Sequence, residues 1–296
     1  MTAQLIDGTA IAAKVREDVA AEVVKMVNAG LPRPGLATVL VGENPASQVY
    51  VRMKHKACEK AGLESYGHVL PADISQEELE KIVRDLNEDP NVNGILVQLP
   101  LPAGLDEERV LNTISIEKDV DGFHPINIGR LAQKGRESLF VPCTPDGALY
   151  LIDQTGFQLK GANAVVLGRS NIVGMPVALL LVKRDATVTI CHSRSKDLPG
   201  ICRQADVLIA AVGRPEMVRG DWIKPGAVVI DVGINRVEDP SLEKGYRLVG
   251  DVAFDEAKEV ASWLTPVPGG VGPMTIAMLM RNTVHAAQLA AAKVKV

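Results

Sequence analysis

The sequence predicts an α/β protein built from two mostly parallel sheets, one in each half of the chain. Short apolar runs alternate with segments of helical periodicity, which is typical of parallel βαβ packing. The alternation stops at a segment rich in proline and glycine, residues 142–147, and then begins again. At 296 residues the chain is long enough for two domains of ordinary size.

The first half is predicted to contain two strands and three helices. The strands are short apolar runs that end near glycine or proline, and the helices carry apolar residues at intervals of three and four. Ser75 and Glu78 have the spacing of a capping box, which marks the start of the third helix. The predicted strands are residues 36–41 and 94–99, and the first two predicted helices are residues 11–26 and 45–61.

The second half repeats the pattern with more strands. Its last segment is rich in alanine and helical, but the pattern does not indicate which half that helix packs against. The predicted strands are residues 164–167, 187–191, 207–212, 228–232 and 247–252, and the predicted helices are residues 174–183 and 274–293.

Composition and charge exclude several classes of protein. The net charge of −4 gives no broad electrostatic reason to bind nucleic acid or an anionic membrane. No apolar run reaches the roughly 18 residues of a membrane span, and the N-terminus lacks the basic and apolar regions of a secretion signal. The four cysteines are far apart in the sequence. We therefore expect reduced thiols, no metal site and a cytoplasmic location.

Residues 164–182 are predicted to run from a strand through a tight turn into a helix. In such a unit the pyrophosphate of a dinucleotide binds at the helix N-terminus. Gly168, Ser170 and Gly174 differ from the usual dinucleotide-binding glycine pattern in both composition and spacing. An ordinary turn between strand and helix is therefore the alternative.

The second strand of this half bears on the choice of cofactor. Proteins that bind a free ribose 2′-hydroxyl usually place Asp or Glu about 20 residues after the first glycine. Here that region reads CHSRS, where Ser193 and Arg194, with Arg169 in the turn, offer hydrogen-bond donors and positive charge. A 2′-phosphate fits these side chains better, so NADP is predicted rather than NAD. Ordinary surface charge is the alternative for the arginines.

Three polar residues of the helix at residues 45–61 are predicted to share one face. Ser47, Tyr50 and Lys54 are spaced by three and four residues. A lysine whose pKa is lowered by burial and by nearby cations exchanges protons effectively near neutral pH. The alternative is that Lys54 is a solvated charge and Tyr50 a half-buried packing residue, and spacing alone favours that alternative.

Three further segments contain candidate ligand-binding residues. Gln98 lies near the end of an apolar strand, where parallel sheets bind ligands, and a glutamine bonded to the backbone is the alternative. Asp119 and Asp121 can orient a polar ligand or belong to a common Asp-Gly turn. Residues 265–275, TPVPGGVGPMT, lack the lysine of a phosphate-binding loop and are predicted to form a rigid, ligand-facing turn.

Together and in this order, these segments resemble the bifunctional methylenetetrahydrofolate dehydrogenase/cyclohydrolase family. The resemblance implies two domains around a cleft and a homodimer. Residues 1–143, joined by the C-terminal helix 274–296, would bind folate, and residues 144–273 would form a Rossmann-like NADP-binding domain. The segments that carry it are SQVYVRMKHKA, GILVQLPLP, KDVDGFHPINIGRL, PCTPDG, VVLGRSNIVGMP, TVTICHSRS, DVGIN and PVPGGVGPMT.

The resemblance also implies two reactions of one-carbon metabolism that serve purine biosynthesis. NADP oxidises 5,10-methylenetetrahydrofolate to the methenyl compound, which is then hydrolysed to 10-formyltetrahydrofolate. By resemblance, Lys54 manages protons in the hydrolysis, Tyr50 and Gln98 position Lys54 and the folate, and Asp121 holds the pterin.

The binding residues that the resemblance implies form two groups. Arg194 and His55 are assigned no role. The folate-binding group is Ser47, Tyr50, Lys54, Gln98, Leu99, Pro100, Asp121, Pro268, Gly269, Gly270, Val271 and Gly272, and the NADP-binding group is Gly168, Arg169, Ser170, Ser193 and Ile234.

Two alternatives to this function stay open. A monofunctional NADP-dependent dehydrogenase is the nearer one, and Lys54, Tyr50 and Gln98 argue against it. The other is a non-catalytic nucleotide-binding protein, which leaves the face of Ser47 to Lys54 and the loop at residues 265–275 unexplained. Because the chain ends at Val296, we expect no formate-ligase domain and only the two activities.

Overall fold

The computed structural model describes residues 2–294, which fall into two compact units. Unit 1 is formed by the described residues up to Ala12 together with Thr144–Thr275. Unit 2 is formed by Ala13–Cys143 together with the described residues from Ile276 on. No helix in the described part of the chain is long and apolar enough to cross a membrane.

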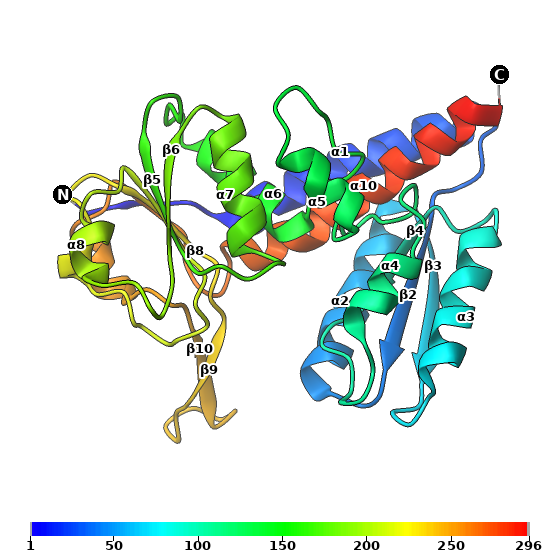
Figure 1. Ribbon diagram of the computed structural model, residues 1–296, viewed down its shortest axis with the longest axis horizontal. Coiled ribbons are helices and arrows are strands. Elements are labelled where there is room, and N and C mark those ends of the chain that lie inside the picture. The colour runs from blue at the N-terminus through cyan, green and yellow to red at the C-terminus, as the bar shows by residue number, and fades with distance from the viewer. Residues whose placement is uncertain (1, 295–296) are drawn as a thin grey trace. The chain divides into compact units, whose positions relative to one another are not determined.

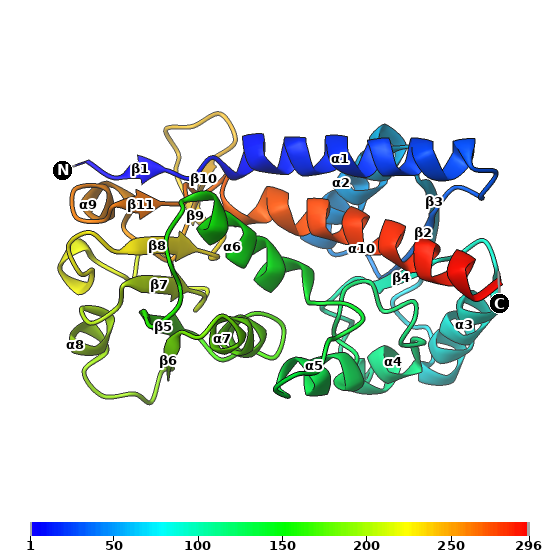
Figure 2. The ribbon, with the colours of Figure 1, turned by 90° about the horizontal axis from the view of Figure 1, so that it is seen from above.

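Unit 1 contains a six-stranded sheet in which all neighbouring strands are parallel (Figure 2). One edge strand comes from the start of the chain, where the sequence predicted no strand, and it pairs with a strand from the last quarter. In spatial order the strands are β1 (Gln4–Leu5), β11 (Trp263–Leu264), β8 (Val228–Asp231), β7 (Val207–Ala210), β5 (Asn163–Leu167) and β6 (Thr187–Cys191).

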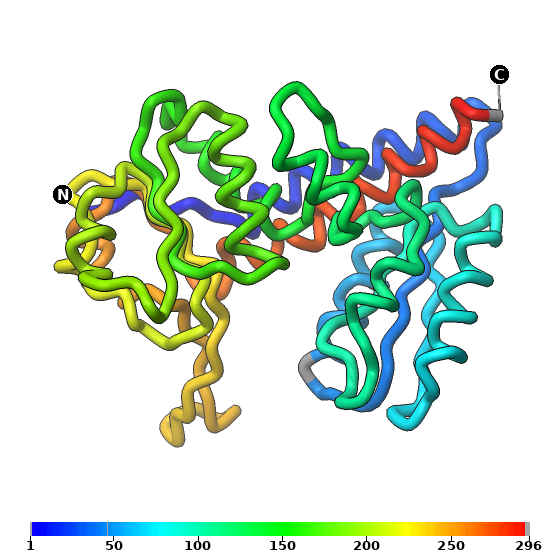
Figure 3. The backbone as a smooth tube through the Cα atoms, in the orientation of Figure 1, coloured from blue at the N-terminus to red at the C-terminus, as the bar shows by residue number. Residues whose placement is uncertain are grey.

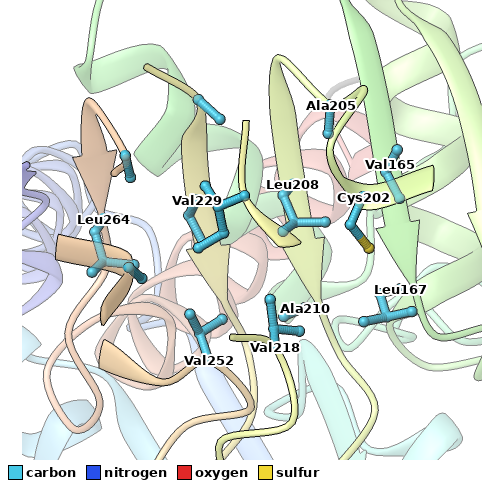
Figure 4. Close-up of a cluster of buried hydrophobic side chains, with 14 of the residues drawn as sticks. Val165, Leu167, Cys202, Ala205, Leu208, Ala210, Val218, Val229, Val252 and Leu264 are labelled. Atoms are coloured by element: carbon cyan, nitrogen blue, oxygen red, sulfur yellow. The ribbon is translucent and has the colours of Figure 1, made fainter. Parts of the chain in front are cut away.

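The central strands of this sheet are apolar along their whole length because both faces are covered. On one face, Val165 and Leu167 of β5 lie beside Leu208 and Ala210 of β7, and Leu264 of β11 closes the same cluster (Figure 4). All five side chains are buried. This packing fixes the strand register and therefore the places where the turns after β5 and β7 begin.

The remaining elements of unit 1 include a hairpin that the sequence did not predict. Its strands pair with each other in antiparallel fashion and lie outside the main sheet (Figure 3). The predicted strand at residues 247–252 is wrong in its bounds, because it ends at Val249. The hairpin strands are β9 (Asn235–Glu238) and β10 (Tyr246–Val249), and the helices are α6 (Cys143–Gln154), α7 (Gly174–Lys183), α8 (Leu198–Cys202), η1 (Gly220–Trp222) and α9 (Phe254–Lys258).

Helix α6 occupies the segment that was predicted to be a break between the halves. It begins at Cys143, and Pro145 lies in its first turn. Proline is tolerated there because the first N–H groups of a helix have no partner within the helix. Gly147 is needed for packing, since a Cβ at this position would lie 2.8 Å from the Cβ of Met274.

Unit 2 contains a three-stranded parallel sheet with a helix on each face (Figure 1). The middle strand is buried along its whole length, as its unbroken apolar sequence predicted. Helix α3 places Leu79, Val83 and Leu86 against one face. The strands are β3 (Glu64–Leu70), β2 (Gly35–Val41) and β4 (Gly94–Val97), and the helices are α2 (Pro45–Ala61), α3 (Gln76–Glu88), α4 (Glu107–Thr113) and α5 (Pro125–Leu131). Most of α1 (Gly8–Asn28) and of α10 (Val271–Val294) also belongs to this unit, while their first residues, up to Ala12 and up to Thr275, belong to unit 1.

Strand β3 was not predicted, because polar residues and a glycine interrupt its apolar pattern. Ser65 Oγ is hydrogen-bonded to His55 Nδ1 at 2.5 Å, and His55 Nε2 is hydrogen-bonded to Thr38 Oγ1 at 3.1 Å. A Cβ at Gly67 would lie 3.0 Å from the His55 ring, so a larger residue there would require the histidine to shift. These polar residues therefore join helix α2 to the sheet.

Candidate functional site

Helix α2 places Lys54 in the interior of unit 2. Its side chain is only 8% exposed, and Ser47 on the same helix is buried as well. Tyr50, between them in sequence, is 39% exposed. Lys54 Nζ donates a hydrogen bond of 2.8 Å to Oε1 of Gln98. The alternative of a solvated lysine is therefore wrong, since the charge is largely removed from water.

Gln98 is held in one orientation by its surroundings. It follows β4, and its backbone N–H donates to the carbonyl of Val39 at 2.8 Å. Its side-chain Nε2 donates to the carbonyl of Leu99 at 2.7 Å, which leaves Oε1 to accept from Lys54. Leu99 is half-buried and is joined by a cis peptide bond to the exposed Pro100.

Lys54 and Asp121 form a charge pair in which burial is the largest influence on both groups. Burial lowers the pKa of Lys54, and the charges of Asp121 and Cys143 act in the opposite direction. Burial raises the pKa of Asp121, while Lys54 and a hydrogen bond from Cys143 act to lower it. Burial thus disfavours the charged form of both groups.

The hydrogen bonds of Asp119 favour the turn role that the sequence had left open beside ligand orientation. Its side chain is buried and accepts hydrogen bonds from the N–H groups of Phe123 at 3.1 Å and His124 at 2.9 Å. It also accepts from Nδ2 of Asn127 at 2.7 Å. All of these donors belong to its own chain segment, so Asp119 shapes the turn that presents Asp121.

The loop before α10 belongs to unit 1 and depends on close backbone approach. Gly269 has a φ of +106°, and its carbonyl accepts a hydrogen bond of 3.4 Å from Oγ1 of Thr9. A Cβ on Gly8 would lie 1.9 Å from the carbonyl oxygen of Gly270. A rigid turn was predicted at this position, and the tight packing agrees with it. Pro268 at its tip is exposed.

The helix after this loop starts earlier than predicted. Val271 and Gly272 already lie in the first turn of α10, and Pro273 follows them without breaking the helix. A Cβ on Gly272 would lie 3.4 Å from Cδ1 of Ile234. Unit 1 thus brings the loop next to Ile234, which was assigned to the cofactor.

The turn between β5 and α7 leaves no space for a side chain at its two glycines. Gly168 has a φ of +126°, and a Cβ on it would lie 2.1 Å from the carbonyl oxygen of Ala211. A Cβ on Gly174 would lie 2.3 Å from the carbonyl oxygen of Gly168. Ser170 Oγ accepts hydrogen bonds from the N–H groups of Val173 and Gly174. Such a backbone cradle at a helix N-terminus fits a pyrophosphate.

The ends of β5 and β6 lie side by side and carry the residues predicted to read the ribose. Leu167 and Cys191 are paired in the sheet, so Arg169 and Ser193 each follow two residues later. Arg169, Ser193 and Arg194 are all exposed. The acid nearest in sequence is Asp197, and its carboxylate caps α8 instead by accepting a hydrogen bond of 3.0 Å from Gly200 N–H. This edge of the sheet therefore fits a 2′-phosphate better than a free hydroxyl.

A buried carboxylate that the sequence reasoning missed fixes the turn after β7. Asp251 is fully buried and accepts hydrogen bonds from the N–H groups of Val212, Gly213 and Arg214 at 2.6–3.0 Å. It also accepts from Nδ2 of Asn235 at 2.9 Å. Since this turn begins beside Gly168, Asp251 indirectly shapes the cradle for the nucleotide.

A second carboxylate completes this arrangement. Asp231 accepts from the N–H groups of Gly233, Asp251 and Val252, and burial raises its pKa to about 7. A Cβ on Gly250 would lie 1.8 Å from Oδ2 of Asp231. The sequence offers two signals for this pair. Asp231 ends an apolar run, and Gly250 directly precedes Asp251.

The structure therefore brings several of the predicted site residues together within a unit. In unit 2, Lys54, Gln98 and Asp121 are brought together, and Cys143 joins them although the sequence had marked it only as an isolated thiol. The described residues contain no group of three or more His, Cys, Asp or Glu side chains that could hold a metal ion.

Comparison with known families identifies the fold and its two parts. Residues 6–121 match the catalytic domain of the tetrahydrofolate dehydrogenase/cyclohydrolase family, and residues 142–291 match its NAD(P)-binding domain. The chain belongs to this family. The predicted family and the predicted α/β fold are both confirmed by these matches and by solved structures of the family.

Several members of the family are similar to nearly the whole of this chain. The bifunctional protein FolD of Moorella thermoacetica is 59% identical over 288 residues, which cover 97% of this chain and 100% of that protein. FolD 4, chloroplastic, of Arabidopsis thaliana is 59% identical over 284 residues, 96% of this chain and 79% of that protein. The Trypanosoma brucei FolD structure, complexed with NADP cofactor and inhibitor, has a TM-score of 0.95 at 44% identity, covering 98% of this chain and 99% of that one.

Proposed function

We propose that this protein oxidises 5,10-methylenetetrahydrofolate to the methenyl compound with NADP and then hydrolyses that compound to 10-formyltetrahydrofolate. Membership of the tetrahydrofolate dehydrogenase/cyclohydrolase family supports both activities. The observation that carries the proposal is the buried Lys54, bonded to Gln98 and influenced by the charge of Asp121. The dehydrogenase step transfers a hydride and moves no proton. A lysine suited to proton exchange therefore supports the hydrolysis in addition to the dehydrogenase activity.

Lys54 is assigned to proton transfer during hydrolysis. As the oxygen of water bonds to the methenyl carbon, the neutral Nζ of Lys54 accepts a proton from that water. The adduct then opens: its hydroxyl loses a proton, N5 gains one, and the bond between N5 and the former methenyl carbon breaks. The formyl group stays on N10. One water is consumed and one proton is released, so Lys54 returns to its neutral form.

The other residues of unit 2 are assigned to binding and orientation. Gln98 holds Nζ of Lys54 through its fixed amide, and Tyr50 is partly exposed on the same helix face as Lys54. Asp121 is assigned to the pterin, whose ring N–H groups suit a carboxylate. The remaining folate contacts are assigned to Ser47, Leu99, Pro100 and, in unit 1, Pro268, Gly269, Gly270, Val271 and Gly272.

Unit 1 is assigned to NADP. When bound, NADP supplies the acceptor for the hydride. Gly168 and Ser170 form the backbone cradle for the pyrophosphate, and the positions of Arg169 and Ser193 support their assignment to the 2′-phosphate. Ile234 is assigned to the nicotinamide end because it lies next to Gly272 of the proposed folate loop.

Assembly, location and domain roles are proposed on family resemblance. We propose a homodimer in the cytoplasm that serves purine synthesis, with folate bound by residues 1–143 and 274–296 and NADP by residues 144–273. The four cysteines, all within the described part of the chain, are buried and form no disulfide, which supports a reducing compartment. Light scattering of the purified protein tests the dimer, and cell fractionation tests the location.

Absorbance measurements test the two activities separately. Purified protein is mixed with methylenetetrahydrofolate and NADP, and the decay of supplied methenyltetrahydrofolate is followed in a second assay. The proposal expects reduction of NADP in the first assay and decay faster than in buffer in the second. Reduction without faster decay leaves a monofunctional dehydrogenase, and neither signal from folded protein contradicts the enzyme assignment.

A further inference from the structure

Unit 2 contains a buried asparagine that the proposed chemistry does not use. Asn282 lies on α10, and its side chain is only 8% exposed. Its Nδ2 donates hydrogen bonds to the carbonyl oxygens of Val120 at 2.9 Å and Val141 at 3.2 Å. Nδ2 also lies 3.7 Å from Sγ of Cys143. A single amide thus joins two separate backbone segments to one helix.

Both segments carry groups that act on the charge of Lys54. Val120 directly precedes Asp121, and Val141 lies two residues before Cys143. Among the described residues, Asp121 and Cys143 are the titratable groups that influence the pKa of Lys54. The place of the asparagine amide therefore determines where these two groups lie.

The two segments are in close backbone contact, so movement of one moves the other. Gly122 has a φ of +79°, and a Cβ on it would lie 2.6 Å from the backbone nitrogen of Pro142. Cys143 Sγ donates to the carbonyl of Val120 at 3.3 Å. Asp119 fixes the far side of the same turn through its bonds to Phe123 and His124. Asn282 is the contact that fixes the turn to α10.

We propose that Asn282 is a positioning residue for the hydrolysis of the methenyl compound, because it sets the distance between Asp121 and Lys54. The inference rests on the proposed function. It explains why a polar side chain stands beside the buried apolar residues Leu279 and Ala286 of the same helix. An apolar residue there would fill the space but would leave two buried carbonyls without this donor.

Two variants on adjacent positions of α10 test the inference. Asn282→Leu keeps a similar volume and removes both hydrogen bonds to the turns. Thr283→Val is the matched control, since Thr283 is also buried but donates only to Leu279 of its own helix. For each variant, methenyl decay is measured against pH, and NADP affinity reports on unit 1, which neither substitution touches.

The inference predicts a specific pattern. Asn282→Leu lowers the maximal rate of methenyl decay about ten- to a hundred-fold, since small displacements of reacting groups cost rates of this size. Without the full charge of Asp121 nearby, the limb of the pH profile that reports Lys54 moves to lower pH. NADP affinity is unchanged, and Thr283→Val keeps both the rate and the profile of wild type.

Other outcomes contradict either the role of Asn282 or the proposed function, and the two can be told apart. A folded Asn282→Leu variant with the wild-type pH profile contradicts positioning, and so does an equal loss in Thr283→Val. If Asn282→Leu does not fold, Asn282→Ser replaces it and is expected to give a smaller shift in the same direction; no shift contradicts the inference. Absence of methenyl decay in wild type instead contradicts the proposed function.

Discussion

Lys54 and Gln98 lie 44 residues apart in the sequence, yet Nζ of one lies 2.8 Å from Oε1 of the other. The lysine comes from α2 and the glutamine from the end of β4, two elements held by the same three-stranded sheet. Because Gln98 has its own amide N–H bonded to Leu99, it presents an oxygen and no proton to Lys54. Nζ of Lys54 can therefore donate this hydrogen bond whether the amine is protonated or neutral.

Removing this amine should separate the two proposed reactions. Lys54→Met keeps the length of the side chain and is expected to slow methenyl hydrolysis by about 100- to 10,000-fold, the usual contribution of a positioned acid or base. NADP reduction with methylenetetrahydrofolate should stay measurable, because hydride transfer needs no proton from Lys54. Lys56→Ala, at an exposed position two residues away, is the control and should leave both rates unchanged. Equal loss of both reactions in Lys54→Met would contradict the assignment.

The pH profile of hydrolysis should respond to charge beside Lys54 in opposite directions. Asp121 raises the pKa of Lys54, so Asp121→Asn lowers it further and moves the Lys54 limb to lower pH. Gln98→Glu adds a negative charge at the bonded oxygen, raises this pKa and moves the limb to higher pH. Rates at saturating substrate across a pH series measure both shifts. Shifts of the same sign in both variants would rule out the electrostatic explanation.

Cofactor choice should change with one residue at the end of β6. Ser193→Asp places a carboxylate where the 2′-phosphate is proposed to bind, so it repels NADP and offers the acceptor that a ribose 2′-hydroxyl prefers. The ratio of kcat/KM for NADP to that for NAD is expected to fall at least about tenfold, which corresponds to about 1.4 kcal/mol. Ser193→Ala, which adds no charge, should change the ratio much less. Unaltered NADP use by Ser193→Asp would disprove the 2′-phosphate assignment.

Asp251 should contribute to the stability of unit 1 through its four hydrogen bonds. Asp251→Asn turns an amide N–H₂ towards backbone donors, so at least one bond is lost and two donors face each other. The free energy of unfolding in urea is expected to fall by about 3 kcal/mol. Asp255→Asn, at an exposed position nearby, serves as the control and should be neutral. Equal unfolding midpoints for the two variants would show that the buried bonds are not stabilising.

The helices and strands with clear periodicity were predictable from the sequence, but the short edge strand of the six-stranded sheet was not. Helix α7 was predicted with its observed bounds, and β6 likewise, because each is an unbroken pattern between clear end signals. Strand β1 was missed because two residues carry no periodicity, and its strand character comes from pairing with β11. Local pattern cannot reveal an element that only a distant partner creates.

The same limit applies to the site. Lys54 and Gln98 were found because each has an unexpected polarity within a helix or next to a strand. Cys143 and Asn282 were missed, since a lone cysteine and a lone asparagine have many ordinary explanations. For Asp119 the sequence left a turn role and a ligand-orienting role open, because its partners, the N–H groups that follow it, are determined by the turn and not by residue type.

The pairing of β1 with β11 sets an order of events during synthesis. Gln4 and Leu5 are synthesised long before their partners Trp263 and Leu264. Until those partners emerge, β8 has an open edge that can pair with another nascent chain. By contrast, all three strands of unit 2 are complete once Val97 has been added. Truncated products that stop before Trp263 therefore leave the edge of β8 without its partner strand.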